Sequence, residues 1–210
     1  NKAIQGVYEL GSTFKIFTVA QALELELVDP KTKINTKGPI RMGGHKINDY
    51  RNNGPELPVW QVITESSNLG TARIAKMIGP EKQREFLSSL GFTKPTSIEM
   101  IEASGGKPLL PKRWNELETM TISYGHGLSA TPLHLATGYA TLANGGRLVK
   151  PTLLEEEKLG LGQQIISKEV AKNSLAMLRG VVTEGTASLA DVNGYFVAGK
   201  TGTADKPSAQ

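Results

Sequence analysis

The stretch Gly11-Ser12-Thr13-Phe14-Lys15 decides the interpretation of this sequence, because it places a serine and a lysine where a helix is expected to begin. Apolar residues recur at mostly helical spacing over 14–27, and Asp29-Pro30 ends the pattern. Residues three apart lie on one face of a helix, so the Lys15 amine can reach the Ser12 hydroxyl. A serine nucleophile with a lysine base requires this arrangement.

Lys15 can act as a base only when it is neutral. Its pKa must therefore fall from about 10.4 to near 7, which corresponds to about 4 kcal/mol of differential interaction. A helix terminus contributes only about 0.3–1 kcal/mol per charge. Burial and a second cation must supply most of the change, and Lys200 is the cation that we expect.

A serine three residues before a lysine is common by chance, and Ser104-Gly105-Gly106-Lys107 repeats the pattern in a stretch that we interpret as a loop. Alone, Ser12 would be interpreted as an N-cap serine and Lys15 as a surface lysine. Two later motifs, Ser66-Ser67-Asn68 and Lys200-Thr201-Gly202-Thr203, change that interpretation. Three motifs in order arise by accident far less often than one.

The composition is that of an ordinary soluble globular domain. The 210 residues can bury a core, and one domain is the simplest expectation. Lys and Arg total 24 against 20 acidic residues, but they are scattered along the chain, so we predict no nucleic-acid partner. The absence of cysteine excludes disulfides, thiolate metal sites and a cysteine nucleophile. No apolar run approaches the roughly 18 residues of a membrane span, so we expect any export signal or anchor outside this segment.

The remaining elements are expected to support these motifs. Loops and short ribbons are predicted over 30–58, and two helices with an interruption at Ser66-Ser67-Asn68 over 59–78. Further helices are expected over 80–90, from the Thr131-Pro132 cap to 142, and from the Ser167 cap to about 182. We expect 196–203 to be a strand whose small residues let an extended ligand approach its backbone.

Several polar residues have two interpretations. Placed at a cleft, Ser66 can relay a proton and Asn68 can hold a substrate amide, whereas the alternative is that Ser66 only caps the second helix. Tyr124 and His126 can line the cleft, although a satisfied turn tyrosine and a surface histidine fit equally well. We interpret His134 as structural.

The chain resembles the transpeptidase domain of class B penicillin-binding proteins nearly end to end, most closely the septal cell-division group called penicillin-binding protein 3. Ser-x-x-Lys, Ser-x-Asn and Lys-Thr-Gly, in this order, are the motifs of penicillin-binding proteins and serine β-lactamases. The stretches that carry the resemblance are Tyr8-Glu9-Leu10-Gly11-Ser12-Thr13-Phe14-Lys15, Ser66-Ser67-Asn68, Ser123-Tyr124-Gly125-His126-Gly127-Leu128 with Thr131-Pro132-Leu133, and Ala198-Gly199-Lys200-Thr201-Gly202-Thr203-Ala204.

This resemblance implies an α/β fold of the α+β type, the penicillin-binding transpeptidase and serine β-lactamase-like fold, with an antiparallel sheet flanked by helices. It implies a periplasmic domain of a single-pass bacterial inner-membrane protein. Its expected partners are peptidoglycan stem peptides ending in D-Ala-D-Ala, β-lactam antibiotics and other cell-division membrane proteins. No cofactor or metal is expected.

The resemblance also implies a role for each site residue. Ser12 would attack the penultimate D-Ala carbonyl with Lys15 as base, and Ser66, hydrogen-bonded to Lys15 and Lys200, would pass the proton to the departing D-Ala. Asn68 would hold a substrate amide. The terminal carboxylate would be received by Lys200, Thr201 and Thr203, and the oxyanion by the backbone N–H groups of Ser12 and Thr203. Gly202 is a further expected substrate-binding residue.

Two features depart from the family pattern. Leu10 and Ile16 stand where relatives commonly have proline, which leaves the motif intact. In the family, further strands and a terminal helix follow the Lys-Thr-Gly strand, whereas this sequence ends at Gln210. We therefore interpret 1–210 as a transpeptidase-domain fragment that lacks the membrane anchor, an N-terminal module and C-terminal strands, and whose open sheet edge would favour association.

Two other functions compete with this interpretation. A serine β-lactamase of the same fold needs a deacylating carboxylate, and Glu102 is the nearest in position, but Gly106 stands where the family has asparagine. The second alternative is a non-catalytic penicillin-sensing or division-scaffold module. No residue favours it, since all the catalytic residue types are present.

Overall fold

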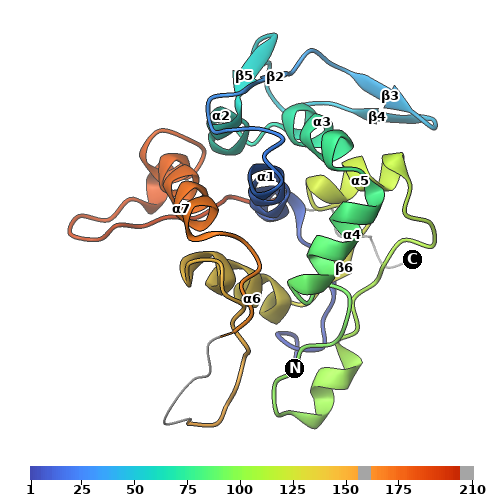
Figure 1. Cartoon of the computed structure of the whole chain (residues 1–210), viewed down its shortest axis with the longest axis vertical. Helices are drawn as coiled ribbons and strands as arrows, with labels where there is room; N and C mark the ends of the chain where they lie inside the picture. The colour runs from blue at the N-terminus through green and yellow to red at the C-terminus, as the bar shows by residue number, and fades with distance from the viewer. Residues whose placement is uncertain (156–161, 204–210) are drawn as a thin grey trace.

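A single buried helix organises the fold. The computed structural model describes residues 1–155 and 162–203, and α1 (Lys15–Glu24) runs through the middle of the molecule (Figure 1). Every residue of α1 from Lys15 to Leu23 is buried. A helix that is enclosed on all sides needs apolar residues around its whole circumference, and Ile16, Phe17 and Val19 supply them with no exposed surface.

An aromatic cluster fixes the start of α1. The rings of Phe14, Phe17 and Phe92 pack edge to face, with centroids 5.0–5.3 Å apart. Tyr139 adds a fourth ring 5.5 Å from that of Phe17. Aromatic pairs in this geometry contribute about 0.5–1.5 kcal/mol each beyond their buried area. The turn that carries Ser12 is therefore attached to an aromatic cluster of the core.

In the described part of the chain, six further helices surround α1 (Figure 1), and five of them were predicted from periodicity and caps. Ser167 and Thr131 cap their helices as expected, each accepting a backbone N–H in the first turn. The helix at 116–123 was missed, although Asn115 and Glu118 form a capping box at its start. The helices are α2 (Val59–Thr64), α3 (Asn68–Ile78), α4 (Pro80–Ser89), α5 (Glu116–Ser123), α6 (Pro132–Ala143) and α7 (Lys168–Thr183), and the short 3₁₀ helices are η1 (Gly11–Phe14), η2 (Ile101–Gly105) and η3 (Ser188–Ala190).

The strands within the described residues form three antiparallel pairs. β1 (Tyr8–Glu9) pairs with β6 (Ser129–Ala130), β2 (Lys33–Asn35) with β5 (Glu56–Pro58), and β3 (Ile40–Met42) with β4 (His45–Ile47). The last two pairs are the ribbons predicted over 30–58, and they lie together beyond α2 and α3 (Figure 1). The mixed helix and strand class is confirmed, but each sheet is a two-stranded ribbon.

The strand predicted over 196–203 is not formed. This segment is extended, but a strand is defined by a ladder of backbone hydrogen bonds, and no strand pairs with it in the part of the chain that the structure describes. Its backbone bond to the core runs from Gly199 N–H to the Leu178 carbonyl at 3.1 Å. Phe196, at its start, is 97% exposed. Within residues 1–155 and 162–203, no helix combines the length and apolar character of a membrane span.

Candidate active site

Ser12 lies in the short helix η1, which runs directly into α1. The Gly11 N–H donates to the Gly125 carbonyl at 3.1 Å, and Gly11 has a φ of 56°, a conformation that favours glycine. Gly125 has a φ of 90°, and a Cβ on it would collide with the Gly11 carbonyl. The caps of η1 and α1 are Leu10 and Phe14, so the interpretation of Ser12 as an N-cap serine is wrong.

The Lys15 amine is buried between two serines. Its Nζ donates to the Ser12 hydroxyl at 2.9 Å, to the Ser66 hydroxyl at 3.0 Å and to the Ser66 carbonyl at 2.6 Å. The residue has no exposed surface. Three acceptors match the three donors of an ammonium. Loss of one proton would leave a lone pair that can accept the Ser12 O–H.

Burial is the main reason that the Lys15 amine can be neutral near physiological pH. The pKa of Lys15 is lowered to about 7, mainly by burial and also by the positive charge of Lys200, while the negative charge of Asp49 acts in the opposite direction. Desolvation and a like charge both disfavour the ammonium form. The direction and both causes agree with the expectation from the sequence.

Ser66 occupies the interruption between α2 and α3. Its φ of 58° is left-handed, which is uncommon for a residue other than glycine. This conformation leaves both its carbonyl and its hydroxyl against the Lys15 amine. The residue that caps α3 is Ser67, whose hydroxyl accepts the Gly70 N–H at 2.9 Å. The alternative that Ser66 is the helix cap is therefore wrong.

Lys200 is half-buried in the extended segment over 196–203. Burial lowers its pKa to about 8. Its Nζ donates to the Thr201 carbonyl at 3.1 Å, and the Thr201 hydroxyl lies 2.7 Å from that of Thr186. Among the described residues, Lys200 makes no hydrogen bond to Ser66, so the contact that the resemblance implied is not formed. The reason is that the Lys200 amine folds back on its own neighbour.

One cavity of about 620 Å³ brings together most of the predicted site residues. Gly202 borders it closely against η1, since a Cβ on Gly202 would lie 2.6 Å from Cγ2 of Thr13. The predicted residues that line the cavity are Ser12, Ser66, Asn68, His126, Thr201, Gly202 and Thr203. Tyr50, Arg51, Glu65 and Thr186 also line it and were missed, because only Glu65 stands next to a motif in the sequence.

Tyr124 and His126 are placed differently. Tyr124 is not among the cavity-lining residues and packs on a small apolar cluster, so it is the turn tyrosine of the alternative interpretation. Its ring meets that of His126 edge to face at 5.3 Å. Nδ1 of His126 lies 2.9 Å from a carboxylate oxygen of Glu9, and the other oxygen of Glu9 accepts the Gly127 N–H at 2.7 Å. These contacts hold the turn beside the cavity.

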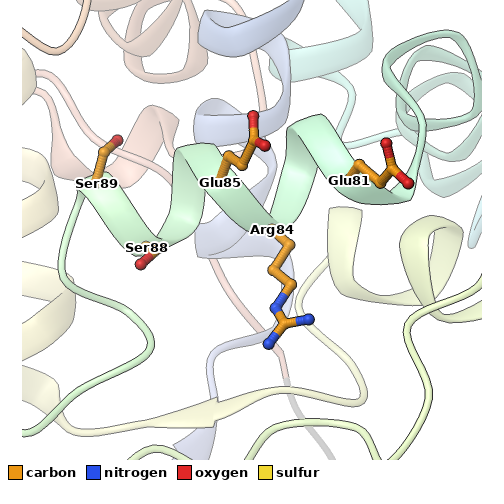
Figure 2. Close-up of a pocket in the computed structure, with 5 residues that line it drawn as sticks. All are labelled: Glu81, Arg84, Glu85, Ser88 and Ser89. Atoms are coloured by element: carbon orange, nitrogen blue, oxygen red, sulfur yellow. The ribbon is translucent and has the colours of Figure 1, made fainter.

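The other large hollow offers no comparable chemistry. It measures about 610 Å³ and lies over the outer face of α4. Figure 2 shows Glu81 and Glu85 on one side of the helix and Arg84 and Ser88 on the other, so the charged groups do not converge. Within residues 1–155 and 162–203, no group of three or more His, Asp or Glu side chains is placed to hold a metal ion.

Comparison with known proteins places this geometry in a family. The family model described as "Penicillin binding protein transpeptidase domain" matches residues 1–210. The chain belongs to this family. The predicted resemblance to class B penicillin-binding proteins is confirmed.

Relatives of this transpeptidase family cover the whole chain. A "Probable peptidoglycan D,D-transpeptidase FtsI" of Caulobacter vibrioides (strain NA1000 / CB15N) is 34% identical over 98% of this chain, which spans 36% of that protein. The TP domain of Burkholderia pseudomallei penicillin-binding protein 3 superposes with a TM-score of 0.92 at 34% identity, over 100% of this chain and 64% of that chain. Penicillin-binding protein 3 from Mycobacterium tuberculosis, complexed with aztreonam, gives a TM-score of 0.86 at 28% identity, over 98% of this chain and 50% of that chain.

Proposed function

We propose that this chain is the catalytic domain of a peptidoglycan D,D-transpeptidase, which cross-links stem peptides through an acyl-enzyme on Ser12. One observation carries the proposal: the fully buried Lys15 amine lies 2.9 Å from the Ser12 hydroxyl and 3.0 Å from the Ser66 hydroxyl. The name of the Caulobacter relative, a probable peptidoglycan D,D-transpeptidase, supports the same reaction.

Acylation begins with transfer of the Ser12 hydroxyl proton to neutral Lys15. Ser12 Oγ bonds to the penultimate D-Ala carbonyl carbon, and the resulting oxyanion accepts the backbone N–H groups of Ser12 and Thr203. One such donor is typically worth about 2.7–4 kcal/mol of the barrier. When the C–N bond breaks, Lys15 returns a proton through the Ser66 hydroxyl to the amine of the departing D-Ala. The relay uses the two hydrogen bonds of Lys15 to the serine hydroxyls.

The segment after the last motif lysine would bind the terminal carboxylate of the substrate. Lys200 supplies positive charge, and Thr201 and Thr203 line the cavity with hydroxyl groups. Asn68, which also lines the cavity, would hold a substrate amide. An amine from a second stem peptide then attacks the acyl-enzyme and passes its proton to Lys15, which returns a proton to Ser12 Oγ as the ester bond breaks. The sequence is a double-displacement acyl transfer.

β-Lactams are expected to acylate the same serine. Attack by Ser12 opens the lactam amide, but the nitrogen that leaves stays tethered to the acyl group, so the adduct persists. The aztreonam complex of the Mycobacterium tuberculosis relative supports this expectation. Glu102, the carboxylate considered for deacylation, is exposed in η2 and does not line the cavity. A hydrolase therefore ranks second.

The test is to incubate the protein and a Ser12→Ala variant with a fluorescent penicillin and to follow the intact mass for hours. A long-lived adduct that is absent from the variant supports the transpeptidase. Rapid loss of the adduct with released penicilloate would favour the β-lactamase. Transfer of a donor acyl group to an added amine would exclude the non-catalytic scaffold, and a folded protein that forms no adduct would exclude Ser12 as nucleophile.

We also propose that the domain works in the periplasm as part of a bacterial inner-membrane protein, at the septum and with other cell-division membrane proteins. The support is the similarity to penicillin-binding protein 3 domains. A fluorescent fusion of the full-length protein should concentrate at the division site. A uniform distribution around the cell would count against the septal role.

A further inference from the structure

A carboxylate that belongs to none of the three motifs contacts the turn that carries Ser66. Asp49 lies in the connection after β4, and its Oδ2 accepts the Ser67 hydroxyl at 2.7 Å. Its Oδ1 accepts the Leu69 backbone N–H at 2.8 Å. Asn53 Nδ2 donates to Oδ2 at 3.2 Å. One side chain therefore contacts the α3 N-terminus through two different residues.

These contacts act on a strained turn. Ser66 is left-handed, and a residue other than glycine keeps that conformation only where its surroundings hold it. Ser67 follows directly, and its hydroxyl oxygen already accepts the Gly70 N–H at 2.9 Å. Its single proton is then donated to Asp49. Asp49 thus fixes the orientation of the cap that immediately follows Ser66.

The same carboxylate brings negative charge close to Lys15. Two charged groups from other elements act on the Lys15 amine: Lys200, from the segment over 196–203, lowers its pKa, and Asp49 raises it. Arg73 of α3 also feels Asp49, but its guanidinium donates to the backbone carbonyls of Asn35 and Lys37. At the Lys15 amine, the charge on Asp49 therefore opposes that of Lys200.

We propose that Asp49 is a positioning residue, which holds the Ser66 turn against Lys15 through Ser67 and the Leu69 amide, and whose charge opposes that of Lys200 at the Lys15 amine. The inference rests on the proposed acyl transfer, because Ser66 and Lys15 are its proton carriers. Two effects follow. Loss of the contacts lowers the rate at high pH, where Lys15 is already neutral, and loss of the charge moves the midpoint of the pH profile.

The test measures the rate constant of acylation by a fluorescent penicillin from pH 5.5 to about 9 for the full chain and its variants. Asp49→Asn should lower the high-pH plateau by roughly tenfold, the worth of about one charge-assisted hydrogen bond. It should also move the midpoint to lower pH. Ser67→Ala keeps the charge, so it should lower the plateau and leave the midpoint in place.

Asp29→Asn is the matched control. Asp29 is also a turn carboxylate that accepts backbone N–H groups, from Lys31 at 2.6 Å and Thr32 at 2.9 Å, but it does not line the cavity. The high-pH acylation rate and the pH midpoint of Asp29→Asn should equal those of the unmodified protein. NMR titration of ¹⁵N-labelled lysine follows the Lys15 amine independently of activity.

Each outcome bears on the proposal. A plateau unchanged in Ser67→Ala would overturn the positioning role, and an unchanged Lys15 titration in folded Asp49→Asn would overturn the charge effect. Equal shifts in Asp29→Asn and Asp49→Asn would also overturn it. If Asp49→Asn does not fold, Ser67→Ala still tests the positioning. Failure of the unmodified protein to be acylated would instead contradict the proposed function.

Discussion

The two lysines of the site, Lys15 and Lys200, are held by the fold in opposite ways. Lys15 lies at the start of α1, has no exposed surface and makes three hydrogen bonds to two serines. Lys200 lies in an extended segment that no strand of the described chain pairs with. That segment is attached through Gly199 N–H to the Leu178 carbonyl at 3.1 Å and through Arg179 Nη1 to the Val197 carbonyl at 2.8 Å.

This difference separates two parts of the proposed reaction. The core fixes the nucleophile and its base before substrate arrives, since Gly11 and Phe14 of η1 and every residue of α1 from Lys15 to Leu23 are buried. The segment that we propose binds the substrate carboxylate is held by hydrogen bonds to Leu178 and Arg179 in the C-terminal half of α7. Changes near Lys15 should therefore act on the chemical step, whereas changes near Lys200 should act mainly on binding.

The largest effect should come from Lys15→Met, which replaces the buried amine by an apolar side chain of similar length. General-base catalysis contributes about 10²–10⁴-fold, so the acylation rate should fall by that factor while the fold is kept. Stopped-flow or gel measurement of penicillin labelling gives the rate, and circular dichroism checks the fold. A fall of less than tenfold would mean that another group takes the Ser12 proton.

Phe17→Ala tests whether the aromatic core fixes the start of α1, next to Ser12. Phe17 has no exposed surface and joins the ring cluster at the start of α1. Such a truncation costs about 3–5 kcal/mol of unfolding free energy, measured by urea denaturation. The matched control on the other side is Phe196→Ala, 97% exposed, which should change the unfolding free energy by less than about 0.5 kcal/mol. Equal losses of unfolding free energy in the two variants would contradict the difference between the buried start of α1 and the exposed segment over 196–203.

The pH dependence of acylation tests whether Lys200 acts on Lys15. Acylation should rise as pH increases through about 7, because deprotonation of Lys15 creates the base. Lys200→Gln removes the like charge, which raises the Lys15 pKa and moves the midpoint to higher pH. Burial remains the larger cause, so the midpoint should stay well below the ordinary lysine value. A midpoint that moved downward, or did not move, would show that Lys200 does not act on Lys15.

The smallest effect should come from Arg179→Met, which deletes the hydrogen bond to the Val197 carbonyl. One hydrogen bond contributes about 0.5–1.5 kcal/mol, so the apparent affinity for the β-lactam should weaken by about two- to tenfold with no change in the pH midpoint. Asp191→Asn is the control, because the Arg179–Asp191 ion pair is partly exposed and such pairs are worth little. A shifted midpoint in Arg179→Met would contradict the separation of binding from chemistry.

Local patterns predicted most of the helices and the first half of the site. The helical periodicity of apolar residues, the prolines and the cap residues predicted α3, α4, α6 and α7. The spacing of Ser12 and Lys15 is a property of one helical turn. The lowered pKa of Lys15 was predicted in direction because the chemistry required it. The eight-residue helix α5 was missed, since so short a segment shows little periodicity.

Contacts between distant segments could not be predicted. Asp49 meets Ser67 and Leu69 across 18 and 20 residues, and no motif marks it. Tyr50, Arg51 and Thr186 reach the cavity from loops for the same reason. The strand expected over 196–203 has the composition of a strand, but composition does not provide a pairing partner.

The close approach of Gly125 to Gly11 also constrains how this domain can evolve under antibiotic selection. Any side chain at Gly125 would collide with the backbone next to the nucleophile, so escape from β-lactams by substitution there would also disable Ser12. Resistant lineages should instead accumulate changes on the cavity rim, at loop positions such as Tyr50, Arg51 and Thr186. Deep mutational scanning under β-lactam selection would map this boundary between permitted and forbidden routes to resistance.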